Sequence, residues 1–174
     1  SPSRTASITS SATATASVSP SVMQPLMNAN SLLVVRVTAG VGTFVDEYSP
    51  SGTLIRSIPL PAVARTAVGA TAACVLVAND TGIGDGKLAL SADGTFATLA
   101  CYNRNGAVDG SAPQLASAAA VARSVARINV DASVVTTSIL TDGFSVARMP
   151  AAVAIDRGSG YWAGGAIADA NAAN

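Results

Sequence analysis

Residues 42–61, GTFVDEYSPSGTLIRSIPLP, carry the clearest fold signal of the chain, because they contain the pattern of a complete β-hairpin. Apolar and β-branched residues predominate in 44–48 and 53–60, which is the composition of β-strands. Between them, residues 49–52 (SPSG) place proline second and glycine fourth, an arrangement typical of a type I turn. The segment therefore predicts two antiparallel strands joined by a tight turn.

The same strand–turn–strand pattern recurs along the chain. It is found at 86–102 (GKLALSADGTFATLACY, turn at 91–94), at 127–140 (RINVDASVVTTSIL, turn around Asp131-Ala132) and at 152–168 (AVAIDRGSGYWAGGAIA, turn at 157–160). Residues 31–39 (SLLVVRVTA) are predicted to form a buried strand before the first hairpin. The first turns lie about 40 residues apart, a spacing typical of propeller blades. We therefore expect an all-β domain over 31–174, built of antiparallel hairpin repeats that form either a propeller-like fold or an Ig-like sandwich.

An N-terminal arm precedes this domain. Residues 5–22 (TASITSSATATASVSPSV) alternate between apolar even positions and polar odd positions, with few exceptions. A period of two residues indicates a strand with one buried face, and such a strand needs a partner edge for its backbone groups. Residues 1–22 are thus predicted to be a donor-strand arm, joined by a linker over 23–30. The positions expected to fill a groove are Ile8, Ala12, Ala14, Ala16, Val18 and Val22. The alternative is a disordered Ser/Thr-rich tail that carries O-linked glycans.

Composition excludes several classes of function. The 174 residues carry ten basic and ten acidic side chains, so the net charge is zero, and aromatic residues are only 4%. We therefore expect no nucleic-acid binding, because that function needs a basic surface and aromatic side chains for base stacking, and this chain offers neither. Histidine is absent, which removes the commonest general base and metal ligand. We expect no enzyme activity, no metal and no cofactor.

A weakly charged chain needs another route to solubility. Only 11% of the residues are charged, with Lys87 the single lysine and Glu47 the single glutamate. Glycan cover is one route and burial in a polymer is another, and both indicate a secreted, extracellular protein.

Two cysteines, Cys74 and Cys101, lie in apolar, strand-like runs. In an oxidising compartment a bridge between them would close a loop of about 28 residues and contribute about 3 kcal/mol. Two buried free thiols are the alternative.

No stretch approaches the roughly 18 consecutive apolar residues of a membrane helix, so no membrane span is expected. The most helix-like run is 115–127, and Arg123 and Arg127 interrupt it.

Candidate chemistry is sparse. Asn79-Asp80-Thr81 matches an N-glycosylation sequon in a glycine-rich loop. Residues 79–87 (NDTGIGDGK) miss the phosphate-loop spacing and offer too few acids for calcium, so we expect a surface loop. The adjacent acids Asp46 and Glu47 should face opposite sides of a strand and cannot form a catalytic pair with one another.

Aromatic residues offer one further candidate. A sugar-stacking patch could draw on Tyr48, Tyr102, Tyr161 and Trp162. Packing of these rings within or beside the β core is the interpretation we favour.

Two resemblances follow from these motifs. The segments SLLVVRV, FVDEYSPSGTLIRSIPLP, LALSADGTFATLACY, VARINVDASVVTTSILTD and AVAIDRGSGYWAGG resemble the opening blades of secreted, functionally uncharacterised β-propeller-like proteins, over residues 32–165. With three or four units, the resemblance implies either a fragment of a propeller or hairpins that close differently, for example as a sandwich. The arm resembles the donor strand of pilins of the spore-coat-U-like and chaperone–usher groups, which implies polymerisation.

The sequence thus predicts an extracellular structural subunit of a filament. Its arm would add a strand to a neighbouring copy, giving a helical homopolymer, with covalent glycans as further partners. The alternative is a secreted propeller-type binding module that recognises carbohydrate or a surface ligand.

Overall fold

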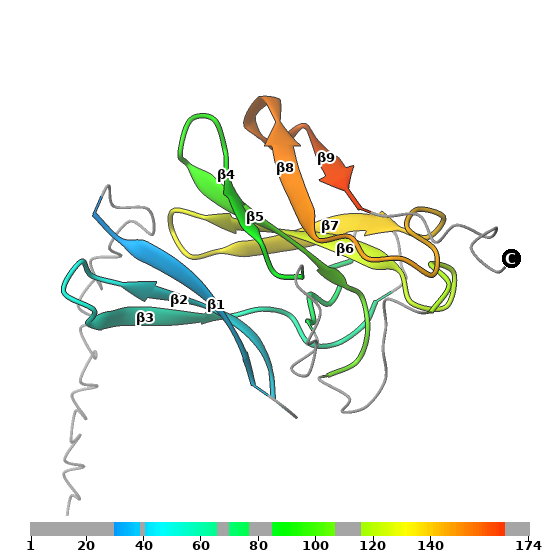
Figure 1. Ribbon diagram of the computed structural model, residues 1–174, viewed down its shortest axis with the longest axis horizontal. Coiled ribbons are helices and arrows are strands. Elements are labelled where there is room, and N and C mark those ends of the chain that lie inside the picture. The colour runs from blue at the N-terminus through cyan, green and yellow to red at the C-terminus, as the bar shows by residue number, and fades with distance from the viewer. Residues whose placement is uncertain (1–29, 39–40, 66–69, 77–84, 107–115, 166–174) are drawn as a thin grey trace, which may run out of the picture.

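A computed structural model describes residues 30–38, 41–65, 70–76, 85–106 and 116–165 of the chain. These residues form nine strands and one short 3₁₀ turn, arranged in three antiparallel sheets (Figure 1). The first sheet contains β1 (Leu32–Thr38), β2 (Gly42–Tyr48) and β3 (Leu54–Pro59). The second contains β4 (Leu88–Leu90), β5 (Phe96–Tyr102), β6 (Arg123–Asn129) and β7 (Val134–Leu140). The third contains β8 (Ala151–Ile155) and β9 (Gly160–Gly164), joined by η2 (Asp156–Gly158). The predicted all-β, antiparallel fold is confirmed.

Each sheet is a meander in which strands that follow one another in sequence lie side by side. The meander arises because each hairpin turn is stabilised by hydrogen bonds between residues that are close in sequence. The amide of Gly52 donates to the Ser49 carbonyl at 2.9 Å, and Gly94 donates to Ser91 at the same distance. Both glycines have positive φ, which completes a type I turn followed by a left-handed residue. The turns predicted at 49–52 and 91–94 are confirmed.

The third turn uses alanine where the other two use glycine. The Ala132 amide donates to the Asn129 carbonyl at 2.9 Å, and Ala132 has φ of 66°. The Asp131 carboxylate accepts from the amide and hydroxyl of Ser133, which supports the turn. The predicted turn around Asp131-Ala132 is confirmed. The fourth turn begins one residue earlier than predicted, since Ile155 pairs with Gly160 across it.

The three sheets stack as successive layers in chain order, with the first and third sheets on opposite faces of the second (Figure 1). One core cluster joins the first and second sheets through Val45, Ile58, Leu60, Cys74, Leu76, Leu99, Cys101, Ala126 and Ile128. A second cluster joins the second and third sheets through Ala100, Val125, Met149 and Ala152. Strand β5 lies between both clusters, which explains why all seven of its residues are buried.

Cys74 and Cys101 form a disulfide, the pairing that the sequence predicted. Both residues belong to the core between the first and second sheets. Cys74 lies in a buried segment (residues 72–76) that is bound to both sheets. The Leu76 amide donates to Thr43 of β2, and the Ala72 amide donates to the Thr136 carbonyl of β7, each at 2.9 Å. The disulfide therefore joins this segment to the central strand β5.

Arg123, the first residue of β6, is fully buried. Its guanidinium donates to the carbonyls of Ala116, Val121 and Ala147, and lies 5.2 Å from the centre of the Tyr102 ring. Burial lowers the pKa of this side chain. Arg123 thus holds two connecting segments, 116–122 and 141–150, against the second sheet.

One expectation is wrong. The strand in 31–39 was expected to be buried, but β1 is the end strand of its sheet, and Leu32 is 62% exposed. Its position in the sheet outweighs its local composition. The interrupted, helix-like run over 115–127 contains the start of a strand, since β6 begins at Arg123 and pairs with β5.

Candidate functional site

The outer edge of β1 is the first candidate site. β1 lies at the end of its sheet, and no other strand of the described residues pairs with this edge. The strand is seven residues long (LLVVRVT) and carries one charge, on Arg36. An unpaired apolar edge of this kind presents free backbone groups and is a template for another strand.

The side chains of β1 that face the core are incompletely covered. Leu33, Val35 and Val37 pack against the cluster between the first and second sheets, yet each is only partly buried. These residues alternate along the strand, so they lie on one face of the sheet beside the open edge. A strand added at this edge would cover them with every second side chain.

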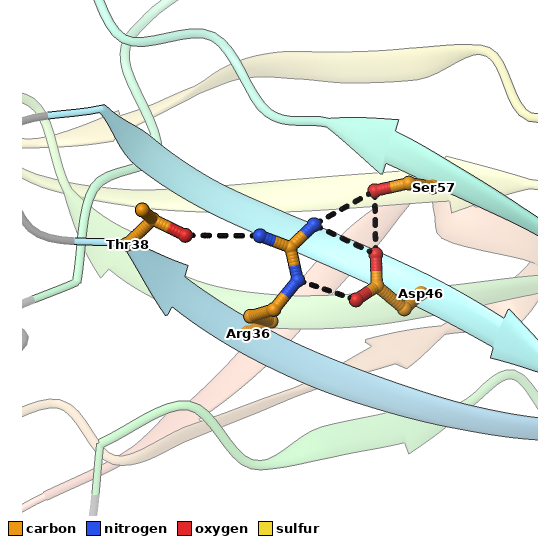
Figure 2. Close-up of polar contacts among 4 residues, drawn as sticks. All are labelled: Arg36, Thr38, Asp46 and Ser57. Carbon is orange, nitrogen blue, oxygen red and sulfur yellow. Dashed lines mark hydrogen bonds and ion pairs between the residues drawn. The ribbon is translucent and has the colours of Figure 1, made fainter. Parts of the chain in front are cut away.

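Arg36 is held on the opposite, outer face of the first sheet (Figure 2). Its Nε and Nη2 donate to the two carboxylate oxygens of Asp46 at 2.6 and 3.2 Å, while Nη2 also donates to Ser57 Oγ at 3.0 Å. Nη1 donates to Thr38 Oγ1 at 2.9 Å. The guanidinium lies 4.3 Å from the centre of the Phe44 ring. One side chain therefore links all three strands.

This cluster keeps Asp46 ionised within the sheet. Asp46 is only 2% exposed, and the Ser57 hydroxyl donates to it at 2.5 Å. The hydrogen bond from Arg36 lowers the pKa of the Asp46 carboxyl, with a further contribution from Ser57, and burial acts in the opposite direction. The charge of Arg36, the only charged residue of β1, is thus neutralised within its own sheet. It therefore does not protect the edge against pairing with another strand.

Stability should be level from pH 7 to pH 5 and fall below about pH 4. The level range follows because the chain has no histidine to titrate there. The folded-state pKa of Asp46 is lowered, and that of Asp93 is lowered to about 2 by hydrogen bonds from Ser91 and Thr95. A lowered pKa contributes stability above the unfolded value of 3.8 and loses it as pH falls toward the folded value. Urea unfolding at pH 7, 5 and 3 measures this profile.

The variant Asp46→Asn tests the contribution of Asp46 to this pH profile. It keeps the shape of the side chain but leaves the Arg36 guanidinium without its counter-charge. Because Arg36 is 43% exposed, we expect a loss of about 1–2 kcal/mol at pH 7, less than for a fully buried pair. The variant should also lose less stability between pH 4 and pH 2 than the parent. An unchanged acid profile would contradict the role assigned to Asp46.

The neighbouring acid, Glu47, points to the other face of β2. Its carboxylate accepts from Arg56 Nε at 2.6 Å, and the Glu47 side chain is 2% exposed. Asp46 and Glu47 therefore each pair with a different arginine on a different face. The expected separation of these two acids is confirmed.

A pocket of about 320 Å³ is the second candidate site. It lies between the β4–β5 turn and the β8–β9 turn, and is lined by Ser91, Ala92, Asp93, Ala154, Asp156 and Arg157. Ser91 and Thr95 donate to the Asp93 carboxylate at 2.7 and 2.8 Å, so part of that carboxylate is already engaged. Two carboxylates and one guanidinium give this pocket groups that can hydrogen-bond a small polar ligand.

Arg127 of β6 positions the β8–β9 turn beside this pocket. Asp156, Arg157 and Gly158 all have positive φ. Gly158 has a φ of 86°, which residues with a side chain rarely adopt, and a Cβ there would also lie 2.7 Å from Arg127 Nη1. Arg127 stacks over the Phe96 ring at 4.0 Å and donates to the Arg157 carbonyl at 3.4 Å. Arg127 of β6 therefore supports the turn that contributes Asp156 and Arg157 to the pocket.

Several predicted site residues lie outside the described residues. These are the donor-strand positions Ile8, Ala12, Ala14, Ala16, Val18 and Val22, and the sequon residue Asn79. Of the loop 79–87, the described part includes Asp85, which accepts from the Tyr102 hydroxyl at 3.0 Å. The predicted pairing of Cys74 with Cys101 is confirmed.

The four aromatic side chains considered for sugar stacking do not converge. Tyr102 is 2% exposed, and Tyr161 packs against the core under the third sheet. Tyr48 lies on the first sheet, whereas Trp162, 70% exposed, lies on the third. The favoured interpretation, packing in or beside the core, holds for Tyr102 and Tyr161. Of the four side chains, only Trp162 has a largely exposed ring.

Sequence reasoning missed the roles of the arginines. Arg36, Arg56, Arg123 and Arg127 each engage a carboxylate, a carbonyl or a ring from another segment. The available signal was arginine within an apolar strand, one in LLVVRVT and two in RSVARIN, which indicates a cation that needs a partner.

Comparisons with known proteins give no relative: no family model, curated protein or solved structure matches the chain. Over the described ranges, no three acidic or cysteine side chains gather in a way that could hold a metal ion. That same part of the chain has no helix with the length and apolar character of a bilayer span.

Proposed function

We propose that this protein is a structural subunit that assembles with copies of itself by β-strand addition. Residues 5–22 of one copy would pair with the outer edge of β1 in another copy. The observation that carries the proposal is the apolar edge of β1, with which no other described strand pairs. Main-chain hydrogen bonds would provide the attachment, and alternate side chains would provide the specificity.

The two partners of this contact are matched in pattern. Even positions of the arm, such as Ile8 and Val18, are apolar and would face the core side, next to Leu33, Val35 and Val37. Odd positions are serine or threonine and would face the outer side, where Arg36 and Asp46 lie. The small size of the arm residues fits an edge whose core-facing side chains are already half-buried.

Charge and covalent structure favour assembly outside the cell. The net charge is zero, so copies do not repel one another over long range. The Cys74–Cys101 disulfide is compatible with an oxidising compartment. Glycans on Asn79 and on serine and threonine residues of the arm belong to the same proposal. A contact between two different surfaces does not close on itself and generates filaments.

Charged substitutions on the two faces of the arm test this function in the full-length chain. Ala14→Asp with Val18→Asp puts charges on the apolar face and should abolish filaments, because two buried carboxylates are too costly. Thr13→Asp with Ser17→Asp adds the same charge to the polar face and should leave filaments intact. Electron microscopy and sedimentation measure the outcome. Filaments in both variants, or in neither, would contradict strand donation in this register.

A synthetic peptide of residues 5–22 distinguishes strand donation from nonspecific association. It should bind the Ala14→Asp, Val18→Asp chain and block assembly of the parent chain. A peptide of the same composition in which the alternation is scrambled is the control. Equal binding of both peptides would contradict the proposal.

A secreted binding module of propeller type is the second candidate. The stacking of three meander sheets in chain order and the pocket between two turns favour it. Soluble oligosaccharides that bind the arm variant, and lose affinity in Arg157→Ala, would support this function in place of the first.

A further inference from the structure

The stack of three sheets ends in an apolar patch on the outer face of the first sheet. By register, Leu32 of β1 lies opposite Tyr48 of β2, which lies opposite Leu54 of β3. Leu32 and Leu54 are 62% and 50% exposed, and the adjacent Val34 is 38% exposed. The four residues Leu32, Val34, Tyr48 and Leu54 are called the first-sheet patch below. A row of apolar side chains across three strands is unusual for a face that meets water.

The other end of the stack also exposes apolar side chains. Val153 of β8 pairs with Trp162 of β9. The neighbouring pair, Ala152 and Ala163, faces the core, so Val153 and Trp162 point away from it. They are 43% and 70% exposed. A largely exposed tryptophan beside a β-branched residue is typical of an interface anchor.

We infer that these two ends bind each other between copies, with Trp162 and Val153 of one copy packed on the first-sheet patch of the next. The occupant of each end is thus a second copy of this chain. The contact repeats the sheet-on-sheet packing that the chain already uses twice, on both faces of the second sheet. It deepens the proposed self-assembly, but it uses faces that are distinct from the β1 edge and does not need the arm.

Electrostatics do not oppose a second copy at this place. Arg36 is the cation nearest the first-sheet patch on β1, and Asp46, Ser57 and Thr38 satisfy its donors (Figure 2). Covering the patch therefore buries no unpaired charge of this cluster. The zero net charge of the chain removes repulsion between stacked copies. Because the two ends differ, stacking is head-to-tail. On its own it is expected to give short, concentration-dependent oligomers, so the Ala14→Asp, Val18→Asp chain should still associate but not form filaments.

Trp162 is the only tryptophan of the chain, so its fluorescence reports this contact without a label. The experiment follows emission and acrylamide quenching in the full-length chain as its concentration rises. In parallel it follows the Ala14→Asp, Val18→Asp chain, whose arm cannot donate. We expect a blue shift and weaker quenching with concentration in both proteins, with association measured by sedimentation velocity.

Leu32→Lys keeps the tryptophan but places a charge in the first-sheet patch. It should weaken head-to-tail association by at least about 10-fold, since it places an unpaired charge in an apolar contact. Val63→Lys is the matched control, because Val63 is 59% exposed and lies outside both faces. Circular dichroism at low concentration checks that both variants are folded.

The outcomes separate this inference from strand donation. Assembly of the parent chain with unchanged tryptophan emission would overturn the inference and leave strand donation intact. A blue shift that Leu32→Lys abolishes, together with filaments in both arm variants, would support the inference and contradict strand donation. Equal effects of Leu32→Lys and Val63→Lys, or a blue shift that requires an added polysaccharide, would also overturn it.

Discussion

Reduction of the Cys74–Cys101 disulfide is expected to lower the free energy of unfolding by about 3–4 kcal/mol. The bond joins residues separated by 27 positions, and the chain-entropy model gives this magnitude for the loop that it closes. The effect should be large in practice because Cys74 lies in the segment between the two main sheets, and Cys101 lies on the central strand. Without the bond, that segment is held by hydrogen bonds and packing alone.

Urea unfolding of the parent chain with and without reductant isolates the covalent bond, since both sulfur atoms remain in the core. Because the bond is buried, the protein is first unfolded in denaturant and then refolded in the presence of reductant, so that the bond is opened. The Cys74→Ala, Cys101→Ala chain is the control and should be insensitive to reductant. A change of less than about 1 kcal/mol on reduction would show that the segment is held without the disulfide.

Replacement of Arg123 by methionine is expected to cost about 2–4 kcal/mol. Methionine retains much of the volume but leaves the carbonyls of Ala116, Val121 and Ala147 without their donor. Each lost hydrogen bond contributes about 1 kcal/mol, and more where the carbonyl is buried. The contact of the guanidinium with the Tyr102 ring is lost as well. Removal of a buried charge offsets part of this cost.

Arg65→Met is the matched control for this substitution, because the Arg65 side chain is exposed. It should change the free energy of unfolding by less than about 0.5 kcal/mol. Hydrogen exchange adds a local measurement: in Arg123→Met, amides of residues 116–122 and 141–150 should lose protection before those of β5. Equal stability of the two variants would contradict the structural role of Arg123.

Local sequence predicted the hairpins well because each turn carries its own chemistry. SPSG and SADG contain the polar first residue and the glycine that a type I turn with a left-handed residue requires. NVDA forms the same turn with alanine at the position of positive φ, supported by the side chains of Asp131 and Ser133. These interactions span only a few residues, so neighbouring sheets hardly affect them.

The predicted burial of 31–39 was wrong because apolar content does not reveal strand order. LLVVRVT reads like a central strand, yet it occupies the end of its sheet. FATLACY has a similar composition and is buried on both faces, because sheets pack on either side of it. The difference between the two strands lies in their partners, which are distant in sequence.

The fold class, the turns and the strands that flank them could be predicted from the sequence, since they depend on periodicity and on contacts within a few residues. The two cysteines could be paired because each lies in an apolar, strand-like run. The edge strands, the arginine contacts across the sheets, and the uncovered apolar side chains such as Leu32 and Trp162 became visible only in the folded chain. Burial and charge pairing depend on segments that are far apart in sequence and come together only when the three sheets stack.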